Sequence, residues 1–299
     1  MSRAPPAATA SEAYVLSYFR TEAEALHLAV SDDGYDFTAL NGGDAVLESD
    51  VGAESIRDPF LYDDGERFHL LGTDGWHSDH VVHATSPDLV AWSAPERLPV
   101  MADVEGTLNT WAPECYYDRE AGVTRLLWSS TVGAGEAPDD PAEQAAYDHR
   151  IWAAETTDFE SFTDPEVFLD PGFNVIDATV ARHDGEYLLA VKDERGANTV
   201  DTDHKDVAIG RAETGRGPFT PLSDPVTPAP VEGPTLYRAD GEWLLLYDHF
   251  IEGDYGASRS PDGEAWERAD DAVSVPEGVR HGSVMGVERG VVESLRDAL

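Results

Sequence analysis

The sequence predicts an all-β fold, a five-bladed β-propeller with four strands in each blade. A unit of roughly 50 to 65 residues occurs five times, and each copy begins with a short polar motif followed by an apolar strand. The terminal unit is divided between the two ends of the chain, as a ring that closes on itself requires. The polar residues that head the five units are Asp58, Glu114, Asp177, Glu232 and His281.

Most units open with a hairpin whose turn is recognisable. Asp64-Gly65, Asp184-Gly185 and Asp240-Gly241 each separate two apolar runs. Asp-Gly between apolar runs is a strong hairpin signal, because a type I′ turn needs positive φ at both central residues. A second hairpin follows the first, as in residues 81–92 and 151–162. Each unit is therefore expected to contain four strands.

The two ends of the chain supply one blade between them. Residues 14–19 and 26–37 read as three strands that lack an inner strand, while residues 281–287 read as an inner strand that lacks the other three. Pairing these segments would close the ring and remove the sheet edges that promote aggregation. The alternative is an all-β sandwich with chance spacing, which would not explain the divided unit.

Composition predicts one propeller domain over residues 13–299 after a disordered leader at residues 1–12. The leader is rich in Ala and Pro and lacks the apolar stretch of a signal peptide, and no segment has the apolar length of a membrane span. We therefore expect a cytoplasmic protein with no membrane partner. Cys115 is the only cysteine, so it has no intrachain disulfide partner and is expected to be a small buried side chain.

The chain is strongly acidic, with 59 Asp and Glu residues, 20 Lys and Arg residues and a formal net charge of −39. A chain of this charge would repel phosphate, which excludes a nucleic-acid partner. Its hydrophobic content of 41% argues against disorder. Lysine occurs only as Lys192 and Lys205. We interpret this composition as that of a halophilic protein, because at 1 M salt the Debye length is only about 3 Å and self-repulsion is screened.

Acidic residues are so common here that only their position in the repeat is informative. Asp58, Asp177 and Glu232 each begin an innermost strand, where a side chain can point toward the axis of a propeller. One alone could be a strand-entry residue that bonds a turn amide. Three acids at corresponding points would repel one another if they had no function, so their recurrence predicts a catalytic centre.

The motifs at the heads of the units resemble those of glycoside hydrolase family 43, a family of five-bladed propellers. They are Asp58-Pro59, Trp111-Ala112-Pro113, Ile176-Asp177, Glu232-Gly233-Pro234 and His281-Gly282-Ser283, in this order from about Tyr14 to Val287. Residues 37–43, leading to Arg57-Asp58-Pro59-Phe60, resemble a group with arabinofuranosidase-like and galactofuranosidase-like members. The resemblance implies an inverting glycoside hydrolase that acts on arabinofuranosyl, xylosyl or galactofuranosyl groups of a small carbohydrate or oligosaccharide.

The resemblance also implies roles for the axial residues. Asp58 matches the general base, Asp177 the residue that tunes the acid, and Glu232 the general acid. An inverting enzyme needs one carboxylic acid to protonate the leaving oxygen and one carboxylate to activate water. A third carboxylate near the acid would raise its pKa by like-charge repulsion. His281 matches an axial histidine that in some members lies near a calcium or another ion, although no cofactor is required.

Two further residues are candidates for substrate binding. Trp111 could offer an aromatic face to a sugar ring, or it could pack between blades. Lys192 is one of two lysines in a chain that otherwise avoids them, and it could pair with an axial carboxylate or contact substrate hydroxyls. A plain surface role for Lys192 is equally compatible with the sequence.

Glu114 raises a different possibility. Arg57-Asp58-Pro59 together with Glu114-Cys115 also resembles motifs of the invertase-like, fructan-cleaving families, which are retaining enzymes on a related propeller. Those families need an earlier Asn-Asp-Pro nucleophile motif, and no such tripeptide precedes Asp58. Glu114 is therefore expected to be a strand-entry or substrate-contacting residue. A non-catalytic carbohydrate-binding propeller and a protein-interaction propeller are also compatible with the repeat.

Overall fold

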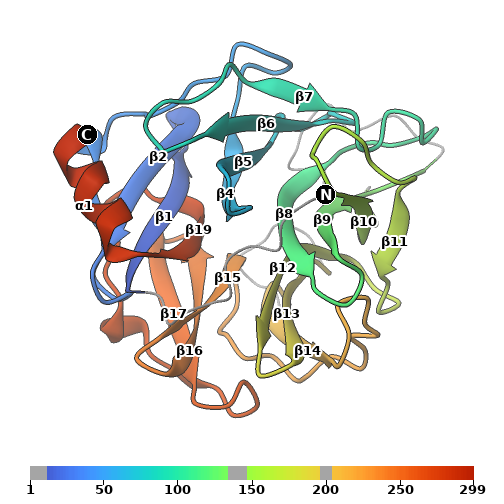
Figure 1. Ribbon diagram of the computed structural model, residues 1–299. Coiled ribbons are helices and arrows are strands. Elements are labelled where there is room, and N and C mark those ends of the chain that lie inside the picture. The colour runs from blue at the N-terminus through green and yellow to red at the C-terminus, as the bar shows by residue number, and fades with distance from the viewer. Residues whose placement is uncertain (1–11, 134–146, 196–203) are drawn as a thin grey trace.

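The repeat folds into a ring of β-sheets around a central axis (Figure 1). The computed structural model describes residues 12–133, 147–195 and 204–299. Over these residues it contains five sheets, and the first strand of each unit lies innermost. The five-bladed propeller predicted from the sequence is therefore confirmed, while the leader at residues 1–12 falls almost wholly outside the described residues.

Strands within each blade are antiparallel, and in blades 1 to 4 they follow one another along the chain. Blade 1 contains β4 (Arg57–Asp63), β5 (Phe68–Thr73), β6 (Val81–Ser86) and β7 (Glu96–Leu98). Blade 2 contains β8 (Trp111–Asp118), β9 (Val123–Ser130), β10 (Arg150–Thr156) and β11 (Glu166–Leu169). Blade 4 contains β15 (Glu232–Ala239), β16 (Glu242–His249), β17 (Asp254–Ser260) and β18 (Glu267–Arg268).

Blade 3 departs from the expected four strands. Its described strands are β12 (Val175–His183), β13 (Glu186–Asp193) and β14 (Val207–Ala212). An irregular segment takes the outer place: Ser223 N–H donates to Ile209 O at 2.9 Å and Val226 N–H to Val207 O at 2.8 Å. Pro221 precedes this segment and Pro225 lies within it, and both lack the N–H that a regular ladder needs.

The closing blade joins the two ends of the chain, as the divided terminal unit predicts. Its order is β19 (Arg280–Val287), β1 (Ala13–Arg20), β2 (Ala23–Ser31) and β3 (Thr38–Ala39). The register places Tyr14 opposite Gly286 and Leu16 opposite Val284. Two short 3₁₀ turns, η1 (Asn41–Gly43) and η3 (Asp270–Ala272), lie in the outer loops.

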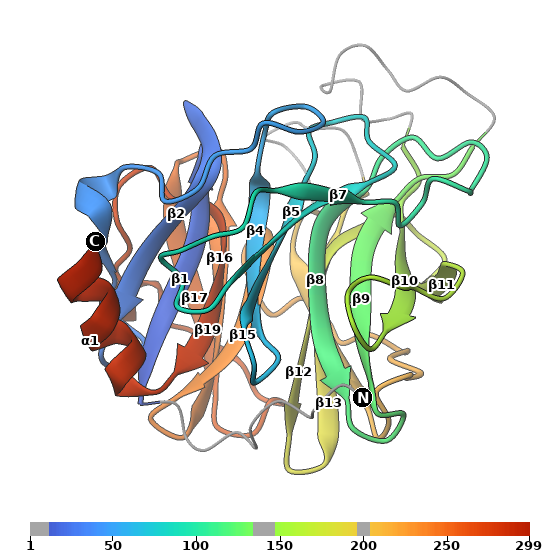
Figure 2. The same ribbon diagram turned by 45° about the horizontal axis from the view of Figure 1, so that its top comes forward.

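The C-terminal helix α1 (Arg289–Ala298) follows β19 and lies beside the closing blade (Figure 2). Its Val292 and Leu295 are fully buried in the same apolar cluster as Val15 and Leu28. Comparable clusters fill the spaces between the other blades, and Cys115 lies buried in the one between blades 1 and 2, as expected. Burial of this apolar area is the main force that holds neighbouring blades together. No helix in the described part of the chain is long and apolar enough to cross a membrane.

Candidate active site

A β-bulge near the start of each inner strand builds the axial site. At the bulge one residue takes a left-handed backbone conformation, with φ between 30° and 57°. Non-glycine residues seldom adopt this conformation, and where they do the surrounding structure must hold them in it. The five residues are Asp58, Ala112, Asp177, Gly233 and His281.

This alignment corrects the one drawn from the sequence. Asp58, Asp177 and His281 do occupy corresponding positions. Glu232, however, stands one residue before the bulge residue of its blade, and Glu114 stands two residues after that of blade 2. The spacing of polar residues alone could not distinguish these positions, because Ala112 and Gly233 carry no polar side chain to mark the repeat.

The bulge residues are tied to the preceding blade by a recurring hydrogen bond. Ala112 N–H donates to Thr73 Oγ1 at 2.7 Å, and Asp177 N–H donates to Ser129 Oγ at 3.1 Å. His281 N–H donates to Asp248 Oδ2 at 3.1 Å. These acceptors share one register position, at the end of the second strand of their blades.

Blade 3 breaks this pattern. The residue at the corresponding position of β13 is Lys192, which pairs in register with Ile176. An ammonium group has no lone pair and cannot accept a hydrogen bond. Gly233 N–H instead donates to Asp177 Oδ2, at 3.1 Å. Asp177 thus takes over the task that a second-strand side chain performs in blades 1, 2 and 4, and it fixes the backbone next to Glu232.

Asp58 is held as a carboxylate. Its Oδ2 accepts a hydrogen bond from Thr73 Oγ1 at 2.7 Å, and its Oδ1 lies 3.2 Å from His281 Nδ1. Burial opposes ionisation, but His281, Arg57 and the Thr73 hydrogen bond outweigh it and hold the pKa of Asp58 well below its usual range. The group is therefore ionised throughout the neutral range.

His281 faces several carboxylates at once. Burial lowers the pKa of a histidine, but Asp58, Asp177 and Glu232 together raise the pKa of His281 to about 10. The side chain is thus an imidazolium at neutral pH. Within the described ranges no three His, Cys, Asp or Glu side chains are grouped so that they could hold a metal ion. The calcium or other axial ion that the resemblance suggested near His281 stays a prediction.

Glu232 lies between two cations. Its Oε2 is 3.3 Å from Lys192 Nζ, and its Oε1 accepts a hydrogen bond from Arg280 Nη2 at 2.9 Å. Arg280 in turn donates from Nε to Asp248 Oδ2 at 2.7 Å. Lys192, for which the sequence allowed either a site or a surface role, is buried in the site. Arg280 and Asp248 were missed, although Arg280 precedes its bulge residue just as Glu232 does.

Asp177 and Glu114 both have raised pKa values. Burial raises the pKa of Asp177 to about 6, with Glu232 and Asp58 adding to the effect and His281 and Lys192 opposing it. Burial raises the pKa of Glu114 to about 8, opposed by a hydrogen bond with Thr179. Glu114 is thus largely protonated at neutral pH, and it lies deeper along its strand than the bulge.

An aromatic wall stands beside the axial groups. Trp111 is only 7% exposed, and its Nε1 donates to Trp76 O at 3.0 Å. The Arg57 guanidinium lies 4.7 Å from the ring centre of Phe19 and 4.6 Å from that of Trp76, and it also pairs with Glu24. Burial leaves Trp111 little free face, so among these rings the half-buried Trp76 presents more surface.

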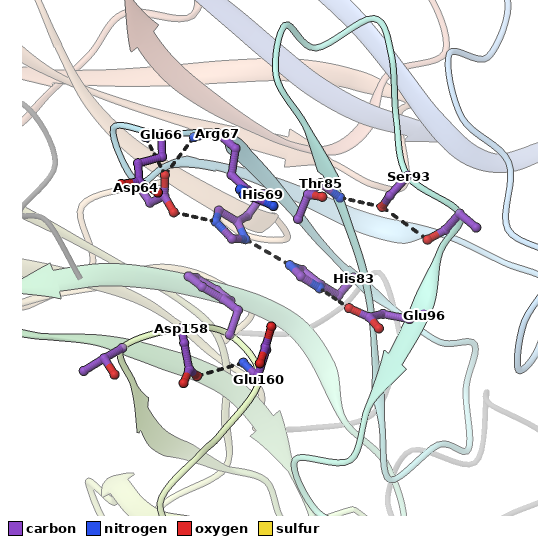
Figure 3. Close-up of a pocket in the computed structure, with 13 residues that line it drawn as sticks. Asp64, Glu66, Arg67, His69, His83, Thr85, Ser93, Glu96, Asp158 and Glu160 are labelled. Carbon is purple, nitrogen blue, oxygen red and sulfur yellow. Dashed lines mark hydrogen bonds and ion pairs between the residues drawn. The ribbon is translucent and has the colours of Figure 1, made fainter. Parts of the chain in front are cut away.

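A separate cavity of about 450 Å³ lies between blades 1 and 2, away from the axis (Figure 3). Its floor is a chain of hydrogen bonds in which Asp64 Oδ2 to His69 Nε2, His69 Nδ1 to His83 Nε2 and His83 Nδ1 to Glu96 Oε1 are each 3.0 Å apart. The Phe159 ring stacks on both imidazoles. The axial carboxylates are not among the residues that line this cavity, and no sequence motif indicated the cavity.

The chain matches a family model described as a probable glycosyl hydrolase domain, related to family 43, over residues 10–293. A curated relative, an α-L-arabinofuranosidase from Bifidobacterium longum subsp. longum, is 27% identical over 268 residues. That match covers 73% of this chain and 25% of the relative, so the chain spans about a quarter of the relative's length.

Solved structures with the same fold include three family 43 proteins. An arabinoxylan arabinofuranohydrolase from Bacillus subtilis has a TM-score of 0.61 at 14% identity, covering 93% of this chain and 68% of that one. An α-L-arabinofuranosidase from Clostridium thermocellum has a TM-score of 0.59 at 13% identity, covering 93% and 95%. A thermostable family 43 glycoside hydrolase has a TM-score of 0.59 at 18% identity, covering 79% and 80%.

The family match covers nearly the whole propeller, including all five inner strands and the axial residues that they carry. The chain therefore belongs to the family 43-related glycosyl hydrolases.

Proposed function

We propose that this glycoside hydrolase cleaves its substrate with inversion of configuration, using Asp58 as general base and Glu232 as general acid. One observation carries the proposal: Asp58, Asp177 and Glu232 come from three blades and all act on His281 at the axis. A purely structural propeller gains nothing by gathering three carboxylates at its axis, because their mutual repulsion and partial desolvation cost stability.

The roles follow from the surroundings of each group. Asp58 is ionised and can take a proton from a water molecule as the water oxygen bonds to the anomeric carbon. The glycosidic C–O bond breaks at the same time, and Glu232 gives its proton to the leaving oxygen. Asp177 holds the backbone beside Glu232, and its negative charge above pH 6 favours retention of the proton by the acid.

We propose an α-L-arabinofuranosyl group as the preferred substrate, with xylosyl and galactofuranosyl groups as the alternatives. The support is the arabinofuranosidase relative, since the solved structures show the fold alone. The test is a panel of 4-nitrophenyl α-L-arabinofuranoside, β-D-xyloside and β-D-galactofuranoside in molar KCl. Hydrolysis of the arabinofuranoside should be fastest. Binding without hydrolysis of any member would favour a non-catalytic carbohydrate-binding propeller.

The state of Glu114 favours one second candidate. Because the pKa of Glu114 is about 8, it is another axial carboxyl that holds a proton at neutral pH. An acid at this position would belong to the invertase-like, retaining alternative. Glu114→Gln and Glu232→Gln, compared on the same substrates, separate the two assignments.

A further inference from the structure

The two lysines of the sequence are both buried, although the chain is acidic and could pair them at its surface. Lys192 is 2% exposed and Lys205 is 1% exposed. Both bind one carboxylate: Glu194 Oε2 lies 3.0 Å from Lys192 Nζ, and Glu194 Oε1 lies 2.5 Å from Lys205 Nζ. Glu194 itself is 4% exposed. Buried charges are costly unless they are paired, so this arrangement needs a reason.

The buried charges form a line that ends at the proposed acid. Their order is Lys205, Glu194, Lys192 and Glu232, with alternating sign. The line has a second connection, because Val231 N–H, next to Glu232, donates to Lys205 O at 2.7 Å. Lys205 thus contacts Glu194 through its side chain and the entry of β15 through its backbone.

The register of blade 3 explains why a lysine, Lys192, lies next to the proposed acid in this line. Lys192 occupies the place where blades 1, 2 and 4 have Thr73, Ser129 and Asp248, each an oxygen acceptor for the next bulge residue. At this position blade 3, which precedes the proposed acid, has a cation in place of the acceptor. A cation here needs a counter-ion behind it, and Glu194 lies two residues along on the same face of the chain.

We propose that Glu194 and Lys205 are positioning residues for Glu232, which act through Lys192 to set how readily Glu232 gives up and regains its proton. This inference rests on the proposed function of Glu232. Without Glu194, the ammonium of Lys192 would be balanced chiefly by Glu232 and would hold it as a carboxylate. Glu194 therefore favours the protonated form of Glu232. Lys205 favours the ionised form, since it draws Glu194 away from Lys192.

The charge states agree with this arrangement. Burial opposes the charges on Glu194 and Lys192, but their partners outweigh it, so the pKa of Glu194 is lowered and that of Lys192 is raised. Burial lowers the pKa of Lys205 against the pull of Glu194, so Lys205 is the weaker cation. Other charged or titratable groups that couple to Glu232 are Asp177 on β12, Asp248 on β16, Tyr255 on β17, and Arg280 and His281 on β19.

The test compares Glu194→Gln, Lys205→Met and the double variant with the wild-type protein. The ¹³C resonance of the Glu232 carboxyl carbon is followed against pH and assigned by its loss in Glu232→Gln. The midpoint should move to lower pH by about 1 unit in Glu194→Gln and to higher pH by a similar amount in Lys205→Met. The double variant should return close to the wild type, because both charges are removed together.

The matched control is Asp193→Asn, which removes a neighbouring carboxylate that pairs with Arg195 and His204. Its midpoint should stay within about 0.3 units of the wild type, because Asp193 lies on the opposite face of β13 from Lys192. Unchanged midpoints in the single variants, or shifts in the same direction, would overturn the inference. If Glu194→Gln does not fold, the upward shift in Lys205→Met decides the question alone.

The alkaline limb of the kcat/KM profile gives a second readout and should move with the carbon resonance. Titration and hydrolysis together distinguish the inference about positioning from the proposed function. Opposite midpoint shifts in a protein that hydrolyses no glycoside would support the inference about positioning and contradict the proposed function. Hydrolysis of a glycoside by variants whose midpoints do not move would support the proposed function and contradict the inference about positioning.

Discussion

The carboxylate of Asp177 accepts a hydrogen bond from the backbone N–H of Gly233, at 3.1 Å. The contact joins blade 3 to blade 4 and fixes the residue that follows Glu232. Lys192 stands where blades 1, 2 and 4 have a side-chain acceptor, and it cannot accept this hydrogen bond. Asp177 accepts it instead, although Asp177 is itself one of the axial carboxyl groups. Asp177 therefore has two separable effects, one through its charge and one through its hydrogen bond.

Asp177→Asn should remove the charge and keep an acceptor for Gly233 N–H. Above pH 6, where Asp177 is ionised, its negative charge opposes ionisation of Glu232. The alkaline limb of the kcat/KM profile should thus move to lower pH by about 1 unit. Asp177→Ala should show the same displacement with a further loss of kcat, because the Gly233 backbone is released. Profiles for Asp177→Asn and wild type that superimpose would contradict this role.

Glu114→Gln should stabilise the protein at alkaline pH. The pKa of Glu114 is about 8 in the fold and near 4.5 when unfolded, so the folded state binds more protons between these values. Its contribution therefore falls as pH rises from 4.5 to 8. The amide mimics the protonated acid, and the free energy of unfolding should rise by about 4 to 5 kcal/mol at pH 8.5 with little change at pH 4.5.

Urea unfolding at the two pH values measures this effect. Glu105→Gln, at an exposed site, is the matched control and should change stability equally at both. A Glu114→Gln protein that is less stable than wild type at pH 8.5 would show that Glu114 is needed as a carboxylate.

Deleting residues from His281 onward should prevent cooperative folding. β19 is the inner strand of the closing blade and pairs with β1, so the deletion opens the ring and exposes β1 as an edge. Deleting residues 289–299 alone removes α1 and keeps β19, and this shorter deletion should give a destabilised but folded protein. Thermal unfolding followed by circular dichroism distinguishes the two, and a sharp transition in the longer deletion would contradict closure.

Salt should stabilise the protein. With a formal net charge of −39, self-repulsion opposes the compact state in dilute buffer and is screened when the Debye length falls to about 3 Å at 1 M salt. Tm should rise substantially between 0.1 M and 3 M KCl. A Tm that is independent of salt would remove the basis for the proposed halophilic character.

Much of the fold could be predicted from the sequence, because the information is local and repeated. Asp-Gly turns at 184–185 and 240–241 mark hairpins whatever surrounds them, and the divided terminal unit specifies closure. The irregular outer segment of blade 3 could not be predicted, since its proximity to β14 depends on contacts made after the sheet has formed.

The site was predicted less completely. Asp58, Asp177, Glu232 and His281 were brought together as expected from their place at the axis. Arg280, which binds Glu232, and Asp248, which binds Arg280, were not predicted. In an acidic chain no single charge stands out, and pairing across blades depends on side-chain direction. The chain from Asp64 to Glu96 through His69 and His83 joins neighbouring strands of one blade, and its hydrogen bonds depend on how the rings are turned.

The assignment of Glu232 as the general acid is tested most directly by the leaving-group dependence of Glu232→Gln. We compare kcat/KM for 2,4-dinitrophenyl and methyl α-L-arabinofuranosides, with Asp58→Asn and Glu114→Gln alongside. Glu232→Gln should lose about 10²-fold or more on the methyl glycoside and less than about 10-fold on the dinitrophenyl glycoside, which departs without protonation. Asp58→Asn should lose activity on both, because water activation is needed whatever departs. Equal losses on both substrates for Glu232→Gln, or the selective pattern in Glu114→Gln, would contradict the assignment.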